Sequence, residues 1–235
     1  MADIAPLKIS LVRQDPQSDD CLRACAQMVF AYFKEPITKE EIWKRLHVYK
    51  KHSGLRGGYT WDLGRLAIRK GYDPLIMHYD WHWWTKNTVG ANSKGKKSLI
   101  AALKELKKQK LDWAQKKEVA KEVKYAKAGG KYKIILPSTE TIDSYLSARI
   151  PVIINVRSED LYKNPNENYA HSIVVVGKEG INYILRDPYL ALEKISSEEL
   201  KYAWSRTGGW MMVLIPNPTK RQAVKTPKAT QRKLL

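Results

Sequence analysis

A cysteine stands where a polar turn gives way to a helix-forming sequence. Residues 14–20 are mostly polar, and apolar residues at helical spacing, Ala24 and Met28 among them, follow Cys21. The pattern predicts a helix from Cys21 to about Phe33. Unpaired backbone N–H groups and the positive end of the helix dipole at such a position lower a thiol pKa from about 8.5 to roughly 3.5–7.5. Cys21 is therefore a candidate nucleophile that needs a base.

The strongest β-strand pattern in the chain is a hairpin that supplies this base. Two apolar strand sequences flank the loop 178–180, whose composition fits a type I turn followed by a left-handed glycine. This loop pairs Gly177 with Ile181 and, counting back, places His171 opposite Asp187. Directly opposed residues share a face of the sheet, with side chains about 5 Å apart. The sequence therefore predicts that the imidazole meets the carboxylate.

Taken singly, these two side chains have ordinary interpretations. His171 could be a strand-end histidine without a role, and Asp187 precedes a proline, as turn-initiating residues often do. Combined with Cys21 they form a set of nucleophile, base and orienter, because the carboxylate fixes the tautomer of the histidine and stabilises its imidazolium.

A glutamine upstream of the cysteine is a candidate oxyanion donor. Its side-chain N–H can act together with the backbone N–H of Cys21 on a developing oxyanion. Gln14 is the better candidate, because Gln17 would need a sharp turn back at Pro16.

These motifs resemble one known family. The matching residues are Gln14, the segment 20–28 (DCLRACAQM), 151–153 (PVI), 171–177 (HSIVVVG) and 187–188 (DP). They are similar to those of the bacteriocin-processing, double-glycine-leader peptidases and their stand-alone relatives, which belong to the papain-like clan. The resemblance covers about residues 7–80 and 134–215.

The resemblance implies a fold and a role for each motif residue. The implied fold is α+β and papain-like, with an N-terminal helical part that carries the nucleophile packed on an antiparallel sheet that carries His and Asp. By this likeness Cys21 is the nucleophile, His171 the general base, Asp187 its orienter and Gln14 the oxyanion donor.

The chain departs from the family pattern in three places. Leu22 stands where family members usually have glycine, directly after the nucleophile. Gln14 stands seven residues before Cys21, where six is usual. A lysine-rich insertion is present, whereas the membrane and ATPase domains of the exporter-linked members are missing, so the resemblance does not imply cleavage after a double glycine.

Charge and composition divide the 235 residues into three parts. The formal net charge is +18, with lysines concentrated between residues 94 and 133 and in the tail. We expect a papain-like peptidase domain over residues 1–215, a basic helical insertion within it at 81–133, and a basic disordered tail at 216–235. Such a charge suggests nucleic acid or an acidic partner, or simply a solvated surface.

The insertion begins with an aromatic cluster, Trp81, Trp83 and Trp84. Aromatic rings beside lysines can stack bases or hold a peptide, but such clusters are more often the hydrophobic anchor of the helices that follow. The sequence leaves the role of this cluster open.

The remaining reactive residues predict no cofactor or metal. Cys25, one turn after Cys21, is a core residue by its position, and two cysteines so placed form no disulfide framework. His78 and His82 are four residues apart, yet their surroundings have the pattern of strand and loop rather than helix. The N-terminus lacks a secretory signal and no apolar run could span a bilayer, so we expect a cytoplasmic protein without a membrane span.

Other elements are expected around these motifs. A capping box at Thr38 predicts a helix that follows it, and Thr60 is expected to cap another. The expected strands are 7–12, 72–79, 152–156, 172–176, 181–188 and 210–215, and the expected helices are 40–46, 61–70, 98–109, 112–128 and 141–148.

The leading hypothesis is a cysteine peptidase that hydrolyses a peptide or isopeptide bond in a peptide or protein substrate through Cys21, His171 and Asp187. A second hypothesis uses the same triad for amide or acyl transfer to an amine, as in transglutaminase-like chemistry. A third is a non-catalytic basic module that binds nucleic acid or an acidic partner.

Overall fold

The structure is a computed structural model that describes residues 3–15, 18–46, 48–49, 57–79, 95–135 and 138–217. Trp81, Trp83 and Trp84, together with Gln17, His82 and the tail from residue 218, lie outside the described residues.

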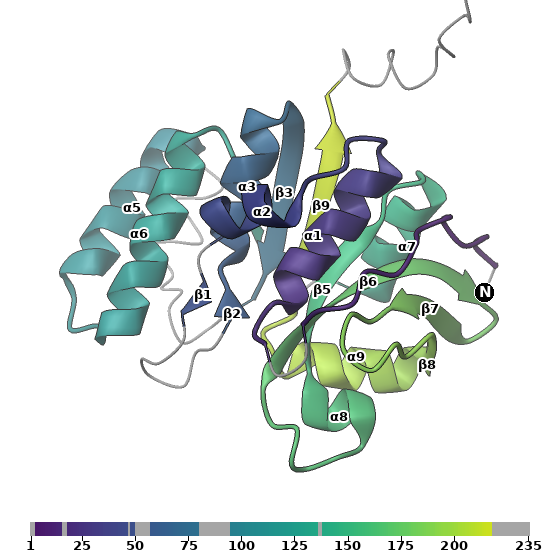
Figure 1. The fold of residues 1–235 in the computed structure, drawn as a ribbon. Coiled ribbons are helices and arrows are strands. Elements are labelled where there is room, and N and C mark those ends of the chain that lie inside the picture. Colours follow the sequence, from purple (N-terminus) through teal and green to yellow (C-terminus); the bar gives the residue numbers. More distant parts are fainter. Residues whose placement is uncertain are drawn as a thin grey trace, which may run out of the picture.

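A seven-stranded sheet forms the centre of the molecule (Figure 1). Its strand order is β4-β3-β9-β5-β6-β7-β8, and all neighbours are antiparallel except β3 and β4, which are parallel. The central strands β5, β6 and β9 are almost continuously buried, as expected for a sheet covered on both faces. The strands are β3 (Tyr72–His78), β4 (Lys131–Ile134), β5 (Val152–Arg157), β6 (Ala170–Glu179), β7 (Asn182–Arg186), β8 (Lys194–Ser196) and β9 (Met211–Pro216), beside a separate pair of β1 (Val48–Tyr49) and β2 (Gly57–Gly58).

Helix α1 (Cys21–Tyr32) lies in front of the sheet in Figure 1 and packs on β6. Its small and apolar residues, including Ala24, Met28 and Val29, are buried, so the helix is held by tertiary packing. The other helices are α2 (Lys39–Arg45), α3 (Thr60–Arg69), α5 (Lys96–Lys108), α6 (Trp113–Lys127), α7 (Thr139–Ser147), α8 (Ser158–Tyr162) and α9 (Ser197–Ser205). This α+β arrangement confirms the expected fold class.

Most predicted elements are present, and the local signals explain where they start. The side chain of Thr38 accepts the N–H of Glu41, as the capping box predicts. Thr60 is the first residue of α3 rather than its cap, because Tyr59 occupies the cap position with extended backbone. Helix α9 was not predicted, although Ser196 and Glu199 form a complete capping box at its start.

The strand expected over residues 7–12 is wrong. The backbone contacts with the sheet come just before this segment and at its first residue: Ile4 bridges Lys178, and the N–H of Leu7 donates to the carbonyl of Val176. Gly177 permits this crossing, since a Cβ there would lie 2.8 Å from the Cα of Pro6. Residues 7–12 then have no strand partner; Leu7 and Ile9 are buried, whereas Leu11 is exposed.

The two lysine-rich helices α5 and α6 pack on each other, and α6 packs on α3. Lys121 of α6 forms a buried ion pair with Asp62 of α3. Tyr125 of α6 is fully buried, and its hydroxyl donates to the carbonyls of Pro74 and Lys131. The basic helices are therefore tied to the body of the molecule by specific buried contacts. Among the helices described, none combines the length and apolar character that crossing a membrane requires.

Candidate active site

Cys21 is the first residue of α1, where the backbone N–H groups of the first turn have no partner inside the helix. It is partly exposed, whereas Cys25, one turn later, is fully buried and donates its thiol to the carbonyl of Ser172, 3.2 Å away. This bond ties α1 to β6 beside His171. The thiol of Cys21 lies next to the His171 side chain, close enough for the two groups to interact.

His171 and Asp187 meet as the sequence predicts. Nε2 of His171 lies 2.7 Å from Oδ1 of Asp187, and both side chains are no more than 1% exposed. Because Nε2 contacts the carboxylate, Nδ1 is the ring nitrogen left for the thiol. Cys21, His171 and Asp187 thus form a continuous chain of contacts.

The strand register that predicted this contact is nevertheless wrong. The turn contains two residues, Gly180 at φ +58° and Ile181, so that Glu179 pairs with Asn182. A β-bulge at Val176 then shifts the register by one residue.

Continued past the end of β7, the observed register sets Asp187 opposite Ile173, two residues from His171 along β6. Residues two apart on a strand face the same side, and diagonal neighbours are within reach of long side chains. The contact is therefore diagonal rather than directly opposed.

Asp187 is held by a ring of donors. Its Oδ1 accepts from the Tyr162 hydroxyl (3.0 Å) and the Tyr189 N–H (2.9 Å), and its Oδ2 accepts from the N–H groups of Leu190 (3.1 Å) and Leu192 (3.2 Å). The turn after β7 wraps around the carboxylate to provide the backbone donors. A buried carboxylate with this many donors stays ionised and keeps a fixed orientation.

The three groups shift one another's proton affinity. Burial acts to raise the pKa of Asp187, but His171 and the backbone donors lower it below its usual value. Burial acts to lower the pKa of His171, but Asp187 and Cys21 raise it to about 9. Burial acts to raise the pKa of Cys21, but His171 lowers it below that of an ordinary thiol. These directions favour a thiolate beside an imidazolium.

Gln14 lies at the edge of this group. Its backbone N–H donates to the carbonyl of Pro188 (3.0 Å), which brings it beside the Asp187 turn. Its side-chain Nε2 donates to the carbonyl of Ser18 (2.9 Å). The structure thus places Gln14 beside the turn that follows Asp187, with its side-chain amide bound to the segment before Cys21.

Leu22 turns away from the solvent. It is 1% exposed, and a Cβ on Gly58 of β2 would lie 3.4 Å from its Cδ2. The bulky residue that replaces the usual glycine therefore packs under β2 as part of the core.

Three tyrosines that were not predicted as site residues surround His171. The rings of Tyr162, Tyr189 and Tyr169 lie with centroids 5.9, 6.3 and 6.4 Å from that of His171. Tyr169 lies in the bend just before β6, Tyr162 ends α8 and Tyr189 lies in the turn after β7, so no local pattern pointed to any of them.

The other histidine considered above is a core residue. His78 is 1% exposed at the end of β3, and its ring stacks on Trp210 at 3.8 Å. Within the described part of the chain, no three metal-binding side chains lie close enough to share an ion.

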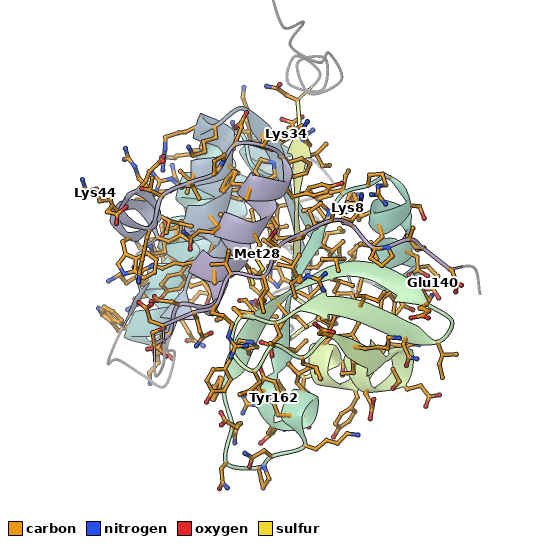
Figure 2. All side chains as sticks on the ribbon, turned by 45° about the vertical axis from the view of Figure 1, so that its right-hand side comes forward. Lys8, Met28, Lys34, Lys44, Glu140 and Tyr162 are labelled. Carbon is orange, nitrogen blue, oxygen red and sulfur yellow. The ribbon has the colours of Figure 1, made fainter. Side chains whose placement is uncertain are left out.

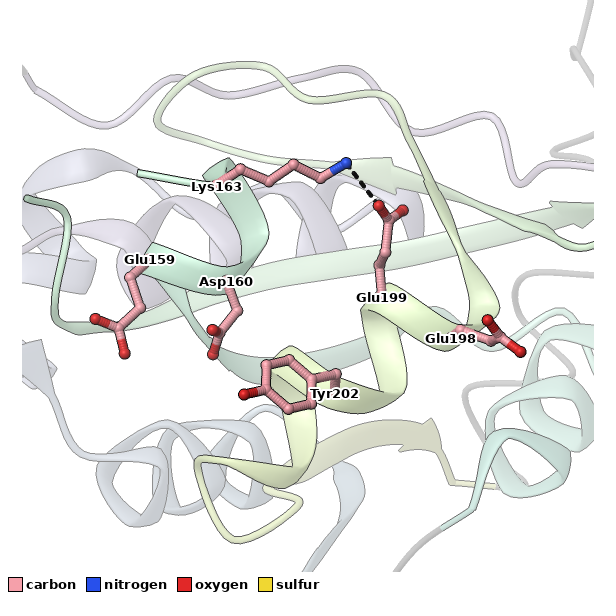
Figure 3. A pocket seen from close by; sticks show the side chains of 6 residues that line it. All are labelled: Glu159, Asp160, Lys163, Glu198, Glu199 and Tyr202. Carbon is pink, nitrogen blue, oxygen red and sulfur yellow. Dashed lines mark ion pairs between the residues drawn. The ribbon is translucent and has the colours of Figure 1, made fainter. Parts of the chain in front are cut away.

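A separate acidic pocket lies between α8 and α9 (Figure 3). Its volume is about 400 Å³, and Lys163 crosses it to pair with Glu199 at 2.7 Å. None of the predicted catalytic residues lines it, so the pocket is distinct from the Cys21 site. The lining residues are Glu159, Asp160, Lys163, Glu198, Glu199 and Tyr202.

A solved structure shares this fold, and two others were matched with lower scores. A protein described as a C39-like peptidase from Bacillus anthracis matches with a TM-score of 0.52 and 12% identity, over 92% of this chain and 98% of that chain. A double glycine motif protease from an AMS/PCAT transporter, solved with its leader peptide, matches with a TM-score of 0.48 and 15% identity, over 92% and 99%. The peptidase domain of Streptococcus ComA, a bifunctional ABC transporter of a quorum-sensing pathway, matches with a TM-score of 0.45 and 15% identity, over 88% and 98%.

Sequence comparison identifies the family. No curated protein matches the chain. The family model described as Peptidase_C39 like family matches residues 6–211, which include Cys21, His171 and Asp187. The chain therefore belongs to the Peptidase_C39-like family and is a cysteine-type peptidase.

Proposed function

We propose that this peptidase hydrolyses a peptide or isopeptide bond through a triad of Cys21, His171 and Asp187. The observation that carries the proposal is the chain of contacts from the thiol through the imidazole to a buried carboxylate 2.7 Å away. Acyl transfer needs the same three groups, so the two reactions are distinguished by the acceptor, water or an amine.

The first half of the reaction forms a thioester. The Cys21 thiolate attacks the carbonyl carbon, and the electron pair moves to the oxygen, which becomes an oxyanion. The N–H of Cys21 and the side-chain amide of Gln14 stabilise this charge. The oxyanion then collapses, the C–N bond breaks, and His171 gives its proton to the leaving amine.

The second half restores the enzyme. His171, now neutral, takes a proton from water as the water oxygen attacks the thioester carbon. The C–S bond breaks, the acid product leaves, and the proton on His171 again faces the Cys21 thiolate. Asp187 keeps its charge throughout, because it orients the ring and stabilises the imidazolium.

The packing of the lysine-rich helices supports a single peptidase domain. The body that contains the triad includes α5 and α6, which are attached through the buried pair of Lys121 with Asp62 and through Tyr125. We therefore propose one peptidase domain over residues 1–215, with the lysine-rich helices as an insertion that packs on it.

A mixture of synthetic peptides, with cleavage read by mass spectrometry, tests the proposal. Cys21→Ala is expected to abolish cleavage, whereas Cys25→Ser, one helical turn away and buried, is expected to retain it. Addition of a primary amine distinguishes transfer from hydrolysis, because transfer gives an amide product. Cleavage that persists in Cys21→Ala would contradict the proposal.

A further inference from the structure

Tyr162 contacts both members of the buried pair. It is the last residue of α8, labelled in Figure 2, and is only partly exposed. Its hydroxyl donates to Oδ1 of Asp187 at 3.0 Å, and its ring centroid lies 5.9 Å from that of His171 at an interplanar angle of 51°. Both contacts come from α8, which is a different element from β6, where His171 lies, and from the turn after β7, where Asp187 lies.

The hydroxyl shares one carboxylate oxygen with the imidazole. Oδ1 of Asp187 accepts from His171 Nε2, the Tyr162 hydroxyl and the Tyr189 N–H, while Oδ2 accepts only backbone N–H groups among the contacts described. A donor on Oδ1 fixes the rotation of the carboxylate. It also competes with the imidazolium for the electron density of that oxygen.

The ring has a second effect. With Tyr189 5.9 Å away, it helps to cover the side chains of His171 and Asp187, which are 1% and 0% exposed. Excluding water strengthens the attraction between imidazolium and carboxylate, because the effective dielectric constant falls.

We propose that Tyr162 is a positioning residue, whose hydroxyl holds Oδ1 of Asp187 and shares it with the imidazolium, and whose ring shields the pair from water. This inference rests on the proposed function, since it assigns Tyr162 a role in the same triad. Tyr162 acts through Asp187 and needs no contact with the substrate.

The effect of Tyr162 on His171 adds to that of several other groups. The titratable groups in contact with the His171 side chain or held next to it are Cys21 on α1, Asp187 after β7, Tyr162 on α8, and Tyr169, Tyr189 and their shared partner Glu167. All of these except Tyr162 stay unchanged in the variants below.

The experiment measures alkylation of Cys21 by iodoacetate between pH 4 and pH 11, with peptide mapping to exclude Cys25. The thiolate displaces iodide, and the anionic reagent is attracted by the imidazolium, so the rate falls at high pH when His171 loses its proton. No substrate is needed. The variants are Tyr162→Phe, which removes only the hydroxyl, and Tyr162→Ala, which also removes the ring.

The two variants are expected to shift the pH at which the alkylation rate falls, in opposite directions and by at least about half a pH unit each. Tyr162→Phe raises it, because the imidazolium no longer shares Oδ1 with the hydroxyl. Tyr162→Ala lowers it, because water reaches the pair and the pKa of His171 returns toward its ordinary value.

Tyr183→Phe is the matched control. Its hydroxyl also donates to a carboxylate, Asp143 at 2.6 Å, on the contact between β7 and α7. This variant loses the same kind of hydrogen bond and is expected to keep the wild-type profile.

Any other pattern for the two Tyr162 variants overturns the role of Tyr162 while wild-type Cys21 still reacts as a low-pKa thiol. A wild-type Cys21 that reacts with the profile of an ordinary thiol overturns the proposed function as well.

Discussion

Two histidines of the central sheet are equally buried and differ in almost everything else. His171 on β6 and His78 at the end of β3 are each 1% exposed. Burial lowers the pKa of His78 to about 3, whereas the pKa of His171 is raised to about 9 against the same burial. One histidine is therefore neutral at pH 7 and the other is positively charged.

The difference between the two pKa values comes from the groups that each histidine contacts. His78 stacks on Trp210, and its Nε2 lies 3.1 Å from the Tyr132 hydroxyl, a neutral partner. His171 contacts the Asp187 carboxylate and the Cys21 thiol. Burial alone thus keeps a histidine neutral. A buried carboxylate that is itself held by hydrogen-bond donors raises the pKa of an equally buried histidine and favours the imidazolium.

The largest expected effect is that of His171→Ala. It removes both the base and the charge that stabilises the thiolate, so peptide cleavage is expected to fall by about 10⁴-fold or more. Alkylation of Cys21 by iodoacetamide should shift to the pH range of an ordinary thiol. Retention of the low-pH reactivity would show that the helix start, rather than His171, sets the thiol pKa.

Asp187→Asn keeps the shape of the side chain and removes its charge. The pKa of His171 should fall toward its ordinary value, and cleavage should decrease by about 10²- to 10³-fold, because the imidazolium and the correct tautomer lose their support. The matched change is Asp143→Asn, a carboxylate that also accepts a tyrosine hydroxyl but lies outside the triad. Equal losses in the two variants would point to a general structural effect.

Gln14→Ala tests the oxyanion donor separately from the base. Cleavage is expected to fall by about 10²-fold, since one donor to the transition state is lost. The rate of Cys21 alkylation should not change, because alkylation forms no oxyanion. Gln27→Ala, on α1 with its amide directed to Ile37, is the control. A parallel loss of alkylation would contradict the assigned role.

His78→Phe is expected to leave cleavage unchanged and to alter only the pH dependence of stability. A folded-state pKa below the unfolded value means that this group contributes stability above about pH 6.5 and loses it as the pH falls toward 3. The loss is about 1.4 kcal/mol per pH unit for one proton. Urea unfolding at pH 7 and pH 5 should show a smaller decrease for the variant, and equal decreases would contradict the interpretation of His78.

For His171 the pH dependence of stability has the opposite sign. Its raised pKa contributes stability that is complete below about pH 6.5 and is lost as the pH rises through about 9. Asp187, whose pKa is lowered, contributes stability that is lost only as the pH falls below its ordinary range. The pair therefore stabilises the folded state most strongly above the ordinary pKa range of an aspartate and below about pH 6.5.

The sequence predicted the components of the site better than their geometry. Cys21 at a helix start followed from an abrupt change in local composition, and helices need only local signals. The register of β6 and β7 was wrong, because a two-residue turn and a bulge at Val176 both shifted it. His171 and Asp187 still meet, because these shifts leave them on one face of the sheet.

Contacts between distant segments could not be predicted in this way. Tyr162 lies 25 residues before Asp187 and reaches it only because α8 packs near β5, which is a tertiary contact without a local signature. The strand expected over residues 7–12 failed for the same reason. The alternation of apolar residues in this segment reflects the burial of Leu7 and Ile9, but the segment pairs with no strand of the sheet.

The central claim is that a buried ion pair makes His171 the base for Cys21. The most direct test is an NMR titration of the His171 ring between pH 5 and pH 10 in the wild-type protein and in Asp187→Asn, with His171→Ala used to assign the resonance. We predict a midpoint near 9 in the wild type, since the raised pKa is about 9, and a lower midpoint in Asp187→Asn. A wild-type midpoint near 6.5, unchanged by Asp187→Asn, would contradict the account.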